Sequence, residues 1–213
     1  MRILFAVRSY HAHARRTFLT RFVQYGELDH FTPVVLAHAP GPAYDWFCQQ
    51  GVEAQLCPLL DQDNAVEPLA DLLRQLRIDL VQTEGYHFQL ARAARKAQIP
   101  HIFRLGAVIQ QGIRDYQESS REAVLAALGH LSQKIICPSC FIAAPLRRSG
   151  YNHVEVIYNG VDLQQLRPGP PSLSQGDPLI AMVAHFLPAK RHQDFIRAAA
   201  QVSELHPGAR FVI

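Results

Sequence analysis

Long apolar runs are missing from this sequence, although 48% of its 213 residues are hydrophobic. The longest apolar stretches, such as 90–94 and 123–128, are soon interrupted or bounded by arginine or glutamate. They fall far short of the roughly 20 residues that a membrane-spanning helix needs. The apolar run near the start is also too short for the core of a signal peptide. We therefore expect no transmembrane span, and we interpret residues 2–7 as a first buried strand.

Concentrated charge is missing as well. The chain has 21 lysines and arginines against 18 aspartates and glutamates, a net charge of +3, and the basic residues are scattered. Binding to nucleic acid needs a basic patch, so we expect no nucleic-acid partner. A mildly basic surface suits anionic substrates or peripheral contact with anionic lipids.

Cysteine is scarce, and the common cofactor motifs are absent. The four cysteines favour a reducing cytoplasm. Cys137 and Cys140 form a C-x-x-C, a redox or half-zinc pattern, but no second pair of metal-ligand spacing accompanies it. We interpret them as packing residues and expect no metal and no other cofactor. The lack of G-x-G-x-x-G, P-loop and G-x-S-x-G motifs disfavours dinucleotide, NTPase and hydrolase functions.

The sequence does contain short apolar runs that alternate with amphipathic stretches. This alternation is typical of βαβ units around a parallel sheet that is buried on both faces, so the predicted fold class is α/β. We predict strands near residues 2–7, 33–38, 53–57, 79–83, 101–105, 133–137, 154–157, 179–184 and 210–213. We predict helices near 15–27, 66–76, 88–98, 114–130, 139–149 and 190–205, with Gly150 as a left-handed cap.

The composition changes sharply at residues 167–178, which are rich in proline, glycine and serine. We predict a linker there, between a first domain of residues 1–166 and a second segment of residues 179–213. That segment, at roughly 35 residues, is shorter than the roughly 40 that usually fold alone. We therefore expect an incomplete second domain, which folds back on the first domain or associates with another chain.

Two segments resemble the domain junction of family-4 glycosyltransferases. One is V-E-V-I-Y-N-G-V-D at residues 154–162, and the other is M-V-A-H-F-L-P-A-K-R at residues 182–191. Asn159-Gly160 alone is a common turn signal, because both residues tolerate positive φ. The resemblance implies a GT-B fold, in which two Rossmann-like domains face each other. The chain would then be a Rossmann-like acceptor-binding domain followed by a truncated second βαβ unit, the beginning of the nucleotide-sugar-binding domain.

The resemblance also implies where a nucleotide-sugar binds. In the family a lysine matching Lys190 binds the donor diphosphate, and we expect Lys190 to begin a helix whose amino end favours anions. The family's arginine about five residues earlier is His185 here, which is largely neutral near pH 7. Arg191, where the family usually has glycine, is the third candidate phosphate-binding residue.

The implied reaction is transfer of a sugar to an acceptor hydroxyl with retention of anomeric configuration. It would make the protein a hexosyltransferase of polysaccharide, lipopolysaccharide or glycolipid synthesis, located in the cytoplasm and in contact with the inner face of the membrane. The family's glutamate-containing donor motif lies beyond Ile213. The chain is therefore expected to be inactive alone, and its catalytic residues stay unidentified.

Acceptor recognition is expected at the carboxyl ends of the strands of the first domain, where open α/β sheets bind ligands. Family members often have a glycine pair in the first loop and histidines at the end of the fourth strand. Here His11-Ala12-His13 and the pair Gln82 and Glu84 occupy those places, which leaves the acceptor class open. The candidate acceptor residues are His11, His13, Glu84, Tyr86, His87 and Arg104.

Two other functions fit the same pattern. The chain can be a non-catalytic Rossmann-like module that binds a ligand or a protein. A sugar-nucleotide epimerase shares the expected two-domain fold, but the junction at residues 159–162 fits it less well.

Overall fold

The structure is a computed structural model, and it describes residues 1–7, 18–26, 28–84, 87–106, 129–164, 166–167, 177–184 and 186–213. The chain divides into two compact units, Met1–Gly160 and Val161–Ile213, called unit 1 and unit 2 below.

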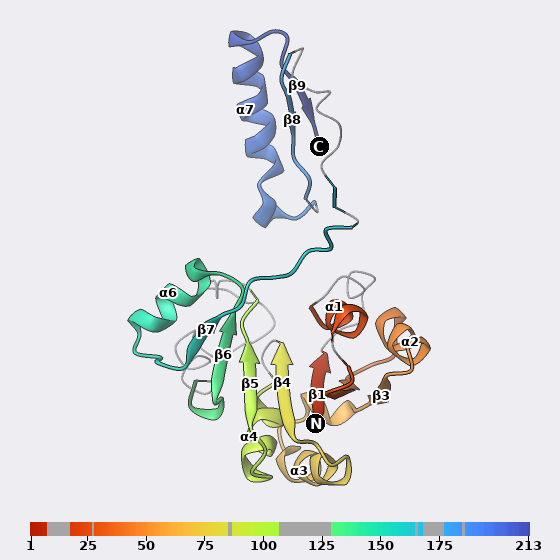
Figure 1. Ribbon diagram of the computed structural model, residues 1–213. Helices are drawn as coiled ribbons and strands as arrows, with labels where there is room; N and C mark the ends of the chain where they lie inside the picture. Colours follow the sequence, from red (N-terminus) through yellow and green to blue (C-terminus); the bar gives the residue numbers. More distant parts are fainter. Residues whose placement is uncertain are drawn as a thin grey trace. The chain divides into compact units, whose positions relative to one another are not determined.

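Unit 1 is built on a parallel sheet of seven strands (Figure 1). In chain order they are β1 (Arg2–Val7), β2 (Thr32–Ala37), β3 (Glu53–Leu56), β4 (Leu80–Glu84), β5 (His101–Arg104), β6 (Lys134–Cys137) and β7 (Val154–Val156). They lie in the order β3-β2-β1-β4-β5-β6-β7, and every neighbouring pair is parallel. The predicted fold class is confirmed.

The direction of strand addition reverses between β1 and β4. The chain adds β2 and β3 on one side of β1, then returns to add β4 to β7 on the other side. In open α/β sheets ligands bind beyond the carboxyl ends of the strands at such a reversal. A ligand site of unit 1 is therefore expected beyond the carboxyl ends of β1, β4 and β5.

The helices of unit 1 largely match the sequence-based prediction. They are α1 (Phe18–Tyr25), α2 (Pro42–Gln49), α3 (Val66–Gln75), α4 (Phe88–Lys96) and α6 (Cys140–Arg148), with the 3-10 turn η2 (Pro58–Asp61). Most of the helix expected at 114–130 lies outside the described residues. Gly150, with φ of 88°, confirms the left-handed position expected after α6. No helix in the described part of the chain is both long and apolar enough to span a bilayer.

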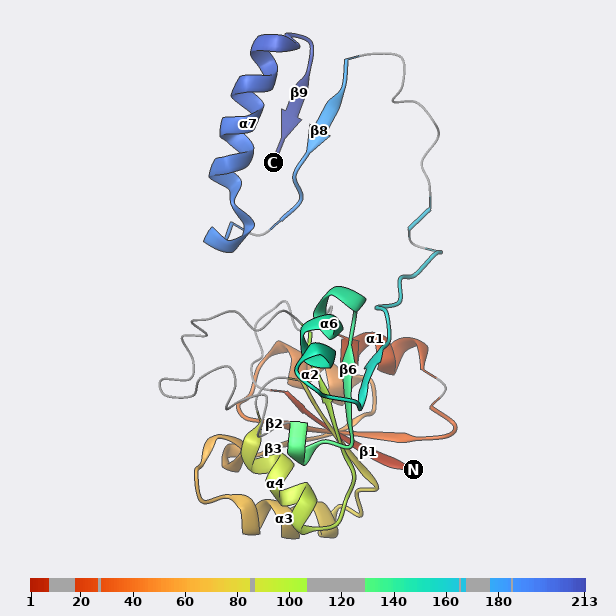
Figure 2. The ribbon, with the colours of Figure 1, turned by 90° about the vertical axis from the view of Figure 1, so that its left-hand side faces the viewer.

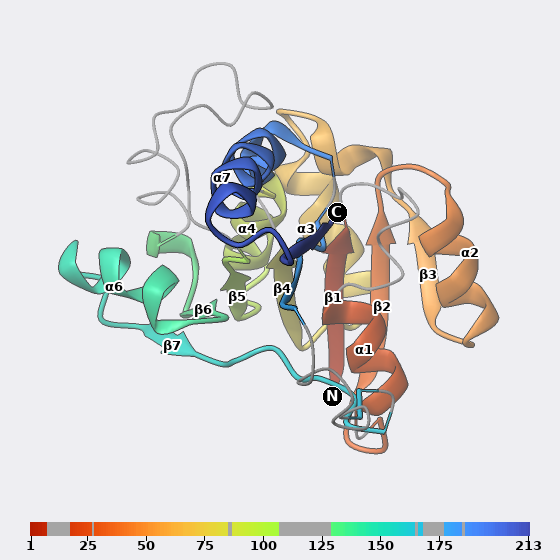
Figure 3. The same cartoon turned by 90° about the horizontal axis from the view of Figure 1, so that it is seen from above.

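Helix α2 is not predicted from the sequence, and the structure corrects this. Such a short helix is marginal on its own, so its amphipathic pattern gives a weak signal. Pro42 occupies the first turn, where its missing N–H costs nothing. Phe47 is buried against the sheet, and this packing stabilises the helix. Figure 3 shows α2 beside β3, and α6 at the opposite end of the sheet near β6 and β7.

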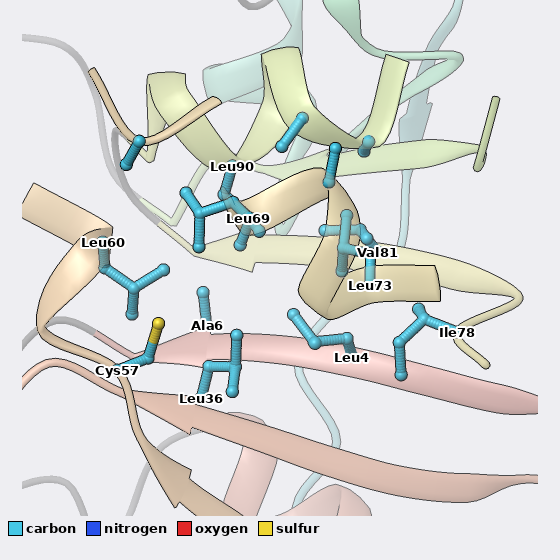
Figure 4. Packing of buried hydrophobic residues seen from close by; sticks show 14 of the residues in the cluster. Leu4, Ala6, Leu36, Cys57, Leu60, Leu69, Leu73, Ile78, Val81 and Leu90 are labelled. Carbon is cyan, nitrogen blue, oxygen red and sulfur yellow. The ribbon is translucent and has the colours of Figure 1, made fainter. Parts of the chain in front are cut away.

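Helices α3 and α4 bury one face of the central strands (Figure 4). Leu69 and Leu73 of α3 and Leu90 of α4 have no exposed surface. Full burial of a leucine side chain contributes about 1.5–3 kcal/mol relative to an exposed one. Their partners in the sheet include Leu4, Ala6, Val34, Leu36 and Val81.

The opposite face of β1 and β2 is covered by α1 and α2. Leu19 and Val23 of α1 and Phe47 of α2 pack with strand residues. The ring of Phe22 lies 5.2 Å from that of Phe5. A third cluster joins α6 to β5, β6 and β7, and it includes Phe103, Ile135, Cys137, Ala143, Leu146 and Val154. The sheet is therefore buried on both faces, as parallel sheets generally are.

Unit 2 is a single βαβ element. The strands β8 (Leu179–Ala181) and β9 (Arg210–Val212) pair in parallel, and the 3-10 turn η3 (Pro188–Lys190) and the helix α7 (His192–Leu205) connect them. Figure 2 shows α7 running alongside both strands. Phe186 and Ile196 are exposed, whereas the ring of Phe211 packs 6.2 Å from that of Phe195. Self-association through this unit stays a prediction.

A buried histidine joins three segments of unit 1. His101 is 1% exposed, and its Nε2 and Nδ1 atoms lie 3.0 Å from the hydroxyls of Thr83 and Ser132. Burial, together with a smaller effect of the nearby His87, lowers the pKa of His101 to about 4. The imidazole is therefore neutral at physiological pH, and each ring nitrogen has a hydroxyl partner.

Leu73→Ala should lower the free energy of unfolding of unit 1 by about 2–5 kcal/mol, because the fully buried site cannot close around the missing atoms. The chain's single tryptophan, Trp46, lies in α2, so its fluorescence during urea denaturation reports on unit 1. Leu163→Ala is the control, because this side chain is 74% exposed. Equal midpoints for the two variants would contradict the assigned core.

Acid should destabilise unit 1 through His101. Because the pKa of His101 is lower in the folded chain, at about 4, than the ordinary 6.5, the unfolded state binds more protons between these values. The stabilisation is complete above pH 6.5 and is lost as the pH falls toward 4. From pH 7 to pH 5 we expect His101 to account for a loss of about 2 kcal/mol. Urea denaturation at both pH values should show a smaller loss for His101→Gln, and an unchanged one for the exposed His206→Gln.

Candidate functional site

The carboxyl ends of β4 and β5 carry the predicted acceptor residues that the structure describes. Glu84 and Arg104 are the last residues of these two strands and are partners in the parallel register. His87 immediately precedes α4. Three other predicted residues, His11, His13 and Tyr86, lie outside the described residues.

Arg104 is held by a residue from the other side of β6. Its Nη2 donates a hydrogen bond of 2.6 Å to Oδ1 of Asn159, which follows β7. The backbone N–H of Ile157 donates to the carbonyl of Cys137 at the end of β6, at 3.0 Å. The segment after β7 is thus fixed to the carboxyl ends of both β5 and β6.

The prediction of a turn at Asn159-Gly160 is wrong. Neither residue is among those with positive φ in the described part of the chain, and residues 157–162 contain no turn. Residues 157–162 are irregular, and the side chain of Asn159 accepts from Arg104 instead of supporting a turn. Sequence reasoning missed this contact because the two residues are 55 positions apart.

His87 occupies a different environment from Arg104. Its side chain is only 2% exposed, and it lies at the N-cap position of α4. Its positive form would disfavour protonation of His101, which indicates that the two imidazoles are close. A role of His87 in acceptor binding stays a prediction.

The two thiols of the C-x-x-C have unlike environments. Cys137 ends β6 and is fully buried, and burial raises the pKa of its thiol, an effect that Arg147 partly offsets. Cys140 begins α6 and is exposed, with its Sγ 3.4 Å from the Oη of Tyr158. Ser139 between them caps α6 by accepting from the N–H of Ile142.

In unit 2 the predicted helix start at Lys190 needs correction. Lys190 ends the turn η3, and Arg191 separates it from α7 with φ of 57° and ψ of 41°. A residue in this left-handed conformation cannot continue a right-handed helix. Lys190 thus lies two residues before the first residue of α7, and its side chain is exposed.

The amino end of α7 combines backbone donors with charged side chains. No side chain of the described residues caps this end, where the backbone N–H groups of Asp194 and Phe195 donate to the carbonyl of Arg191. The positive end of the helix dipole favours an anion here. Arg191 Nε forms an ion pair with Oδ2 of Asp194, and Arg197 Nη1 lies 3.4 Å from Oδ1 of the same carboxylate. Asp194 was not identified from the sequence. The only pattern that pointed to it is the preference for acidic residues in the first turn of a helix.

A cavity of about 560 Å³ borders this end of α7. Phe186, Leu187 and Pro188 form its apolar wall, and Arg191, His192 and Asp194 supply polar groups. The rings of Phe186 and His192 stack at 4.6 Å. Lys190 does not line the cavity, and His185 lies outside the described residues.

Residues 57–165 of the chain match the family model described as Glycosyltransferase Family 4. This range is just over half of the chain and lies almost entirely in unit 1. No curated protein gives a significant match to the sequence.

Solved structures share the fold along nearly the whole chain. The structure of Anabaena HepE in complex with UDP and glucose aligns with a TM-score of 0.71 and 16% identity, over 99% of this chain and 60% of that one. A glycosyltransferase from Rickettsia africae gives 0.67 and 14%, over 95% of this chain and 57% of that one. The UDP-GlcNAc 2-epimerase of Methanocaldococcus jannaschii gives 0.54 and 13%, over 100% and 66%. At these identities the likeness shows the fold alone, and the chain spans about 60% of the HepE chain.

The left-handed conformation of Arg191 should destabilise the start of α7, and the substitution Arg191→Gly should remove this steric cost. Arg191→Gly and Arg191→Ala both remove the ion pair with Asp194, but only glycine adopts a φ of 57° without a steric cost. We expect the amides of α7 to exchange about fivefold more slowly in Arg191→Gly than in Arg191→Ala. This corresponds to a difference of about 1 kcal/mol in the free energy of opening the helix. Hydrogen exchange read by mass spectrometry over residues 192–205 measures this. Faster exchange with glycine than with alanine would contradict the assigned backbone conformation.

Proposed function

We propose, because the chain belongs to Glycosyltransferase Family 4, that the protein takes part in transferring a sugar from a nucleotide-diphosphate-sugar to an acceptor hydroxyl. The observation that carries this proposal is the match of residues 57–165 to the family model. The shared fold with HepE, which was solved with UDP and glucose, supports a uridine nucleotide as the donor.

The donor diphosphate binds at the amino end of α7 in this proposal. Lys190 and Arg191 bring two cations to a helix end whose backbone donors no described side chain caps. Backbone N–H groups, the helix dipole and cations together make such an end suitable for phosphate. His185, between β8 and η3, is the third proposed phosphate ligand.

The proposed reaction proceeds with retention of configuration at the sugar. Negative charge grows on the leaving β-phosphate as the sugar becomes oxocarbenium-like, and the cations at α7 stabilise that charge. By analogy with a single oxyanion-hole donor, each well-placed cation lowers the barrier by roughly 3–4 kcal/mol. The leaving phosphate accepts the proton of the acceptor hydroxyl, so no metal or other cofactor is required.

The acceptor binds to unit 1 beyond the carboxyl ends of β1, β4 and β5. Arg104 is the best supported acceptor residue, because Asn159 holds its guanidinium at this edge. The same proposal includes His11, His13, Glu84, Tyr86 and His87. We propose a carbohydrate or glycolipid acceptor, in polysaccharide, lipopolysaccharide or glycolipid synthesis at the cytoplasmic face of the membrane.

A sugar-nucleotide epimerase is the second candidate, because such an enzyme shares this fold with a TM-score of 0.54. The family match favours a transferase. The two functions differ in their products: a transferase moves the sugar to an acceptor, whereas an epimerase returns a nucleotide-sugar of altered configuration. A non-catalytic module would bind UDP and form neither product.

Lys190→Ala should weaken the binding of UDP about tenfold or more, because a cation close to the diphosphate is lost. Isothermal titration calorimetry of the 213-residue chain at low salt measures the affinity. Lys96→Ala is the matched control: it removes the same charge from α4 of unit 1, where Lys96 pairs with Glu67. Equal affinities for the two variants would refute the donor site at α7.

A further inference from the structure

The first turn of α7 contains a carboxylate beside the residues proposed to bind phosphate. Asp194 accepts from Arg191 and from Arg197, so one carboxylate joins the two guanidinium groups. We propose that Asp194 is an exchange partner for the donor diphosphate: it holds Arg191 in the absence of ligand and releases it to a phosphate oxygen on binding. This inference rests on the proposed function and adds a residue that sets the affinity of the site.

The geometry brings the competing groups to one place. Arg191 and Asp194 both line the cavity of about 560 Å³ at the amino end of α7. An anion that enters the cavity comes within reach of the guanidinium and, at the same time, of the negative carboxylate. Binding to Arg191 therefore requires the anion to compete with Asp194 for the same Nε–H group.

Breaking the ion pair between Arg191 and Asp194 costs little free energy, because the pair is exposed. The side chain of Arg191 is 77% exposed and that of Asp194 is 43% exposed. Ion pairs in such positions contribute little to stability, since water competes for both partners. A diphosphate carries more negative charge than a carboxylate and offers more acceptor oxygens, so it is the stronger partner for a guanidinium.

Arg197 gives the carboxylate a second partner. Its Nη1 lies 3.4 Å from Oδ1 of Asp194, whereas Arg191 contacts the other oxygen, Oδ2. When Arg191 turns to the phosphate, Asp194 keeps the ion pair with Arg197 and its favourable position in the first turn of the helix. The carboxylate therefore stays close to the bound anion and repels it.

The consequence is a site with moderated affinity for anions. Repulsion by the Asp194 carboxylate lowers the affinity for any anion, and it lowers the affinity for a diphosphate most, because the repulsion grows with the charge of the ligand. It therefore keeps the nucleoside diphosphate product from binding too tightly to leave.

Pyrophosphate is the probe that isolates this interaction, because it has the charged group of the donor without base or sugar. Calorimetric titration of the 213-residue chain at low salt should show that Asp194→Asn binds pyrophosphate about three- to tenfold more tightly. Asp194→Glu retains the charge and should bind as the unchanged chain does. Glu204→Gln removes the same charge near the other end of α7 and should change the affinity less than twofold.

Lys190→Ala in the same titration separates this inference from the proposed function. If Lys190→Ala binds pyrophosphate as tightly as the unchanged chain, or if the unchanged chain does not bind it, the donor site itself is wrong. If Lys190→Ala weakens binding but Asp194→Asn binds equally or more weakly, the donor site stands and the exchange role of Asp194 is overturned. Circular dichroism of Asp194→Asn checks that α7 is intact, and Asp194→Ser provides a second neutral variant if it is not.

Discussion

The parallel pairing of β1 with both β2 and β4 is the constraint on which unit 1 depends. It makes β1 the central strand, so its residues must be apolar on both faces, and Leu4, Phe5 and Ala6 are all buried. Helices have to cover both sides, and the chain crosses over between strands instead of turning back. All connections that leave the carboxyl ends of the strands then gather at one edge, which is why chemically distinct residues from distant parts of the sequence meet there.

In unit 2, in contrast, the charged residues of the proposed site are close neighbours in the sequence. Lys190, Arg191 and Asp194 lie close together in the sequence, and the left-handed conformation of Arg191 sets how the chain passes from η3 into α7. Arg191 adopts a left-handed backbone conformation that favours glycine, and its side chain lies at the amino end of α7. The steric cost of this conformation and the proposed anion chemistry therefore come from the same residue.

Family membership supports the two halves of the proposed function unequally. The matched range of residues 57–165 includes β4, β5, β6 and β7 with the contact between Arg104 and Asn159, so it bears on the acceptor side. Lys190 and α7 lie outside that range. The donor side depends on the charges and backbone geometry of unit 2 and on a fold shared with nucleotide-binding structures.

The sequence by itself determined the fold class and the strands, because short apolar runs that alternate with amphipathic segments are typical of a parallel sheet covered by helices. It also determined the Gly150 cap, since few other residues fit there. It missed α2, whose stability comes from burying Phe47, and it misassigned Asn159 and the start of α7. Only the tertiary structure decided that Asn159 contacts Arg104, that His101 has two hydroxyl partners, and that Asp194 joins two arginines. Local pattern specifies periodicity and caps, whereas a contact between side chains depends on backbone positions that are fixed only when the chain has packed.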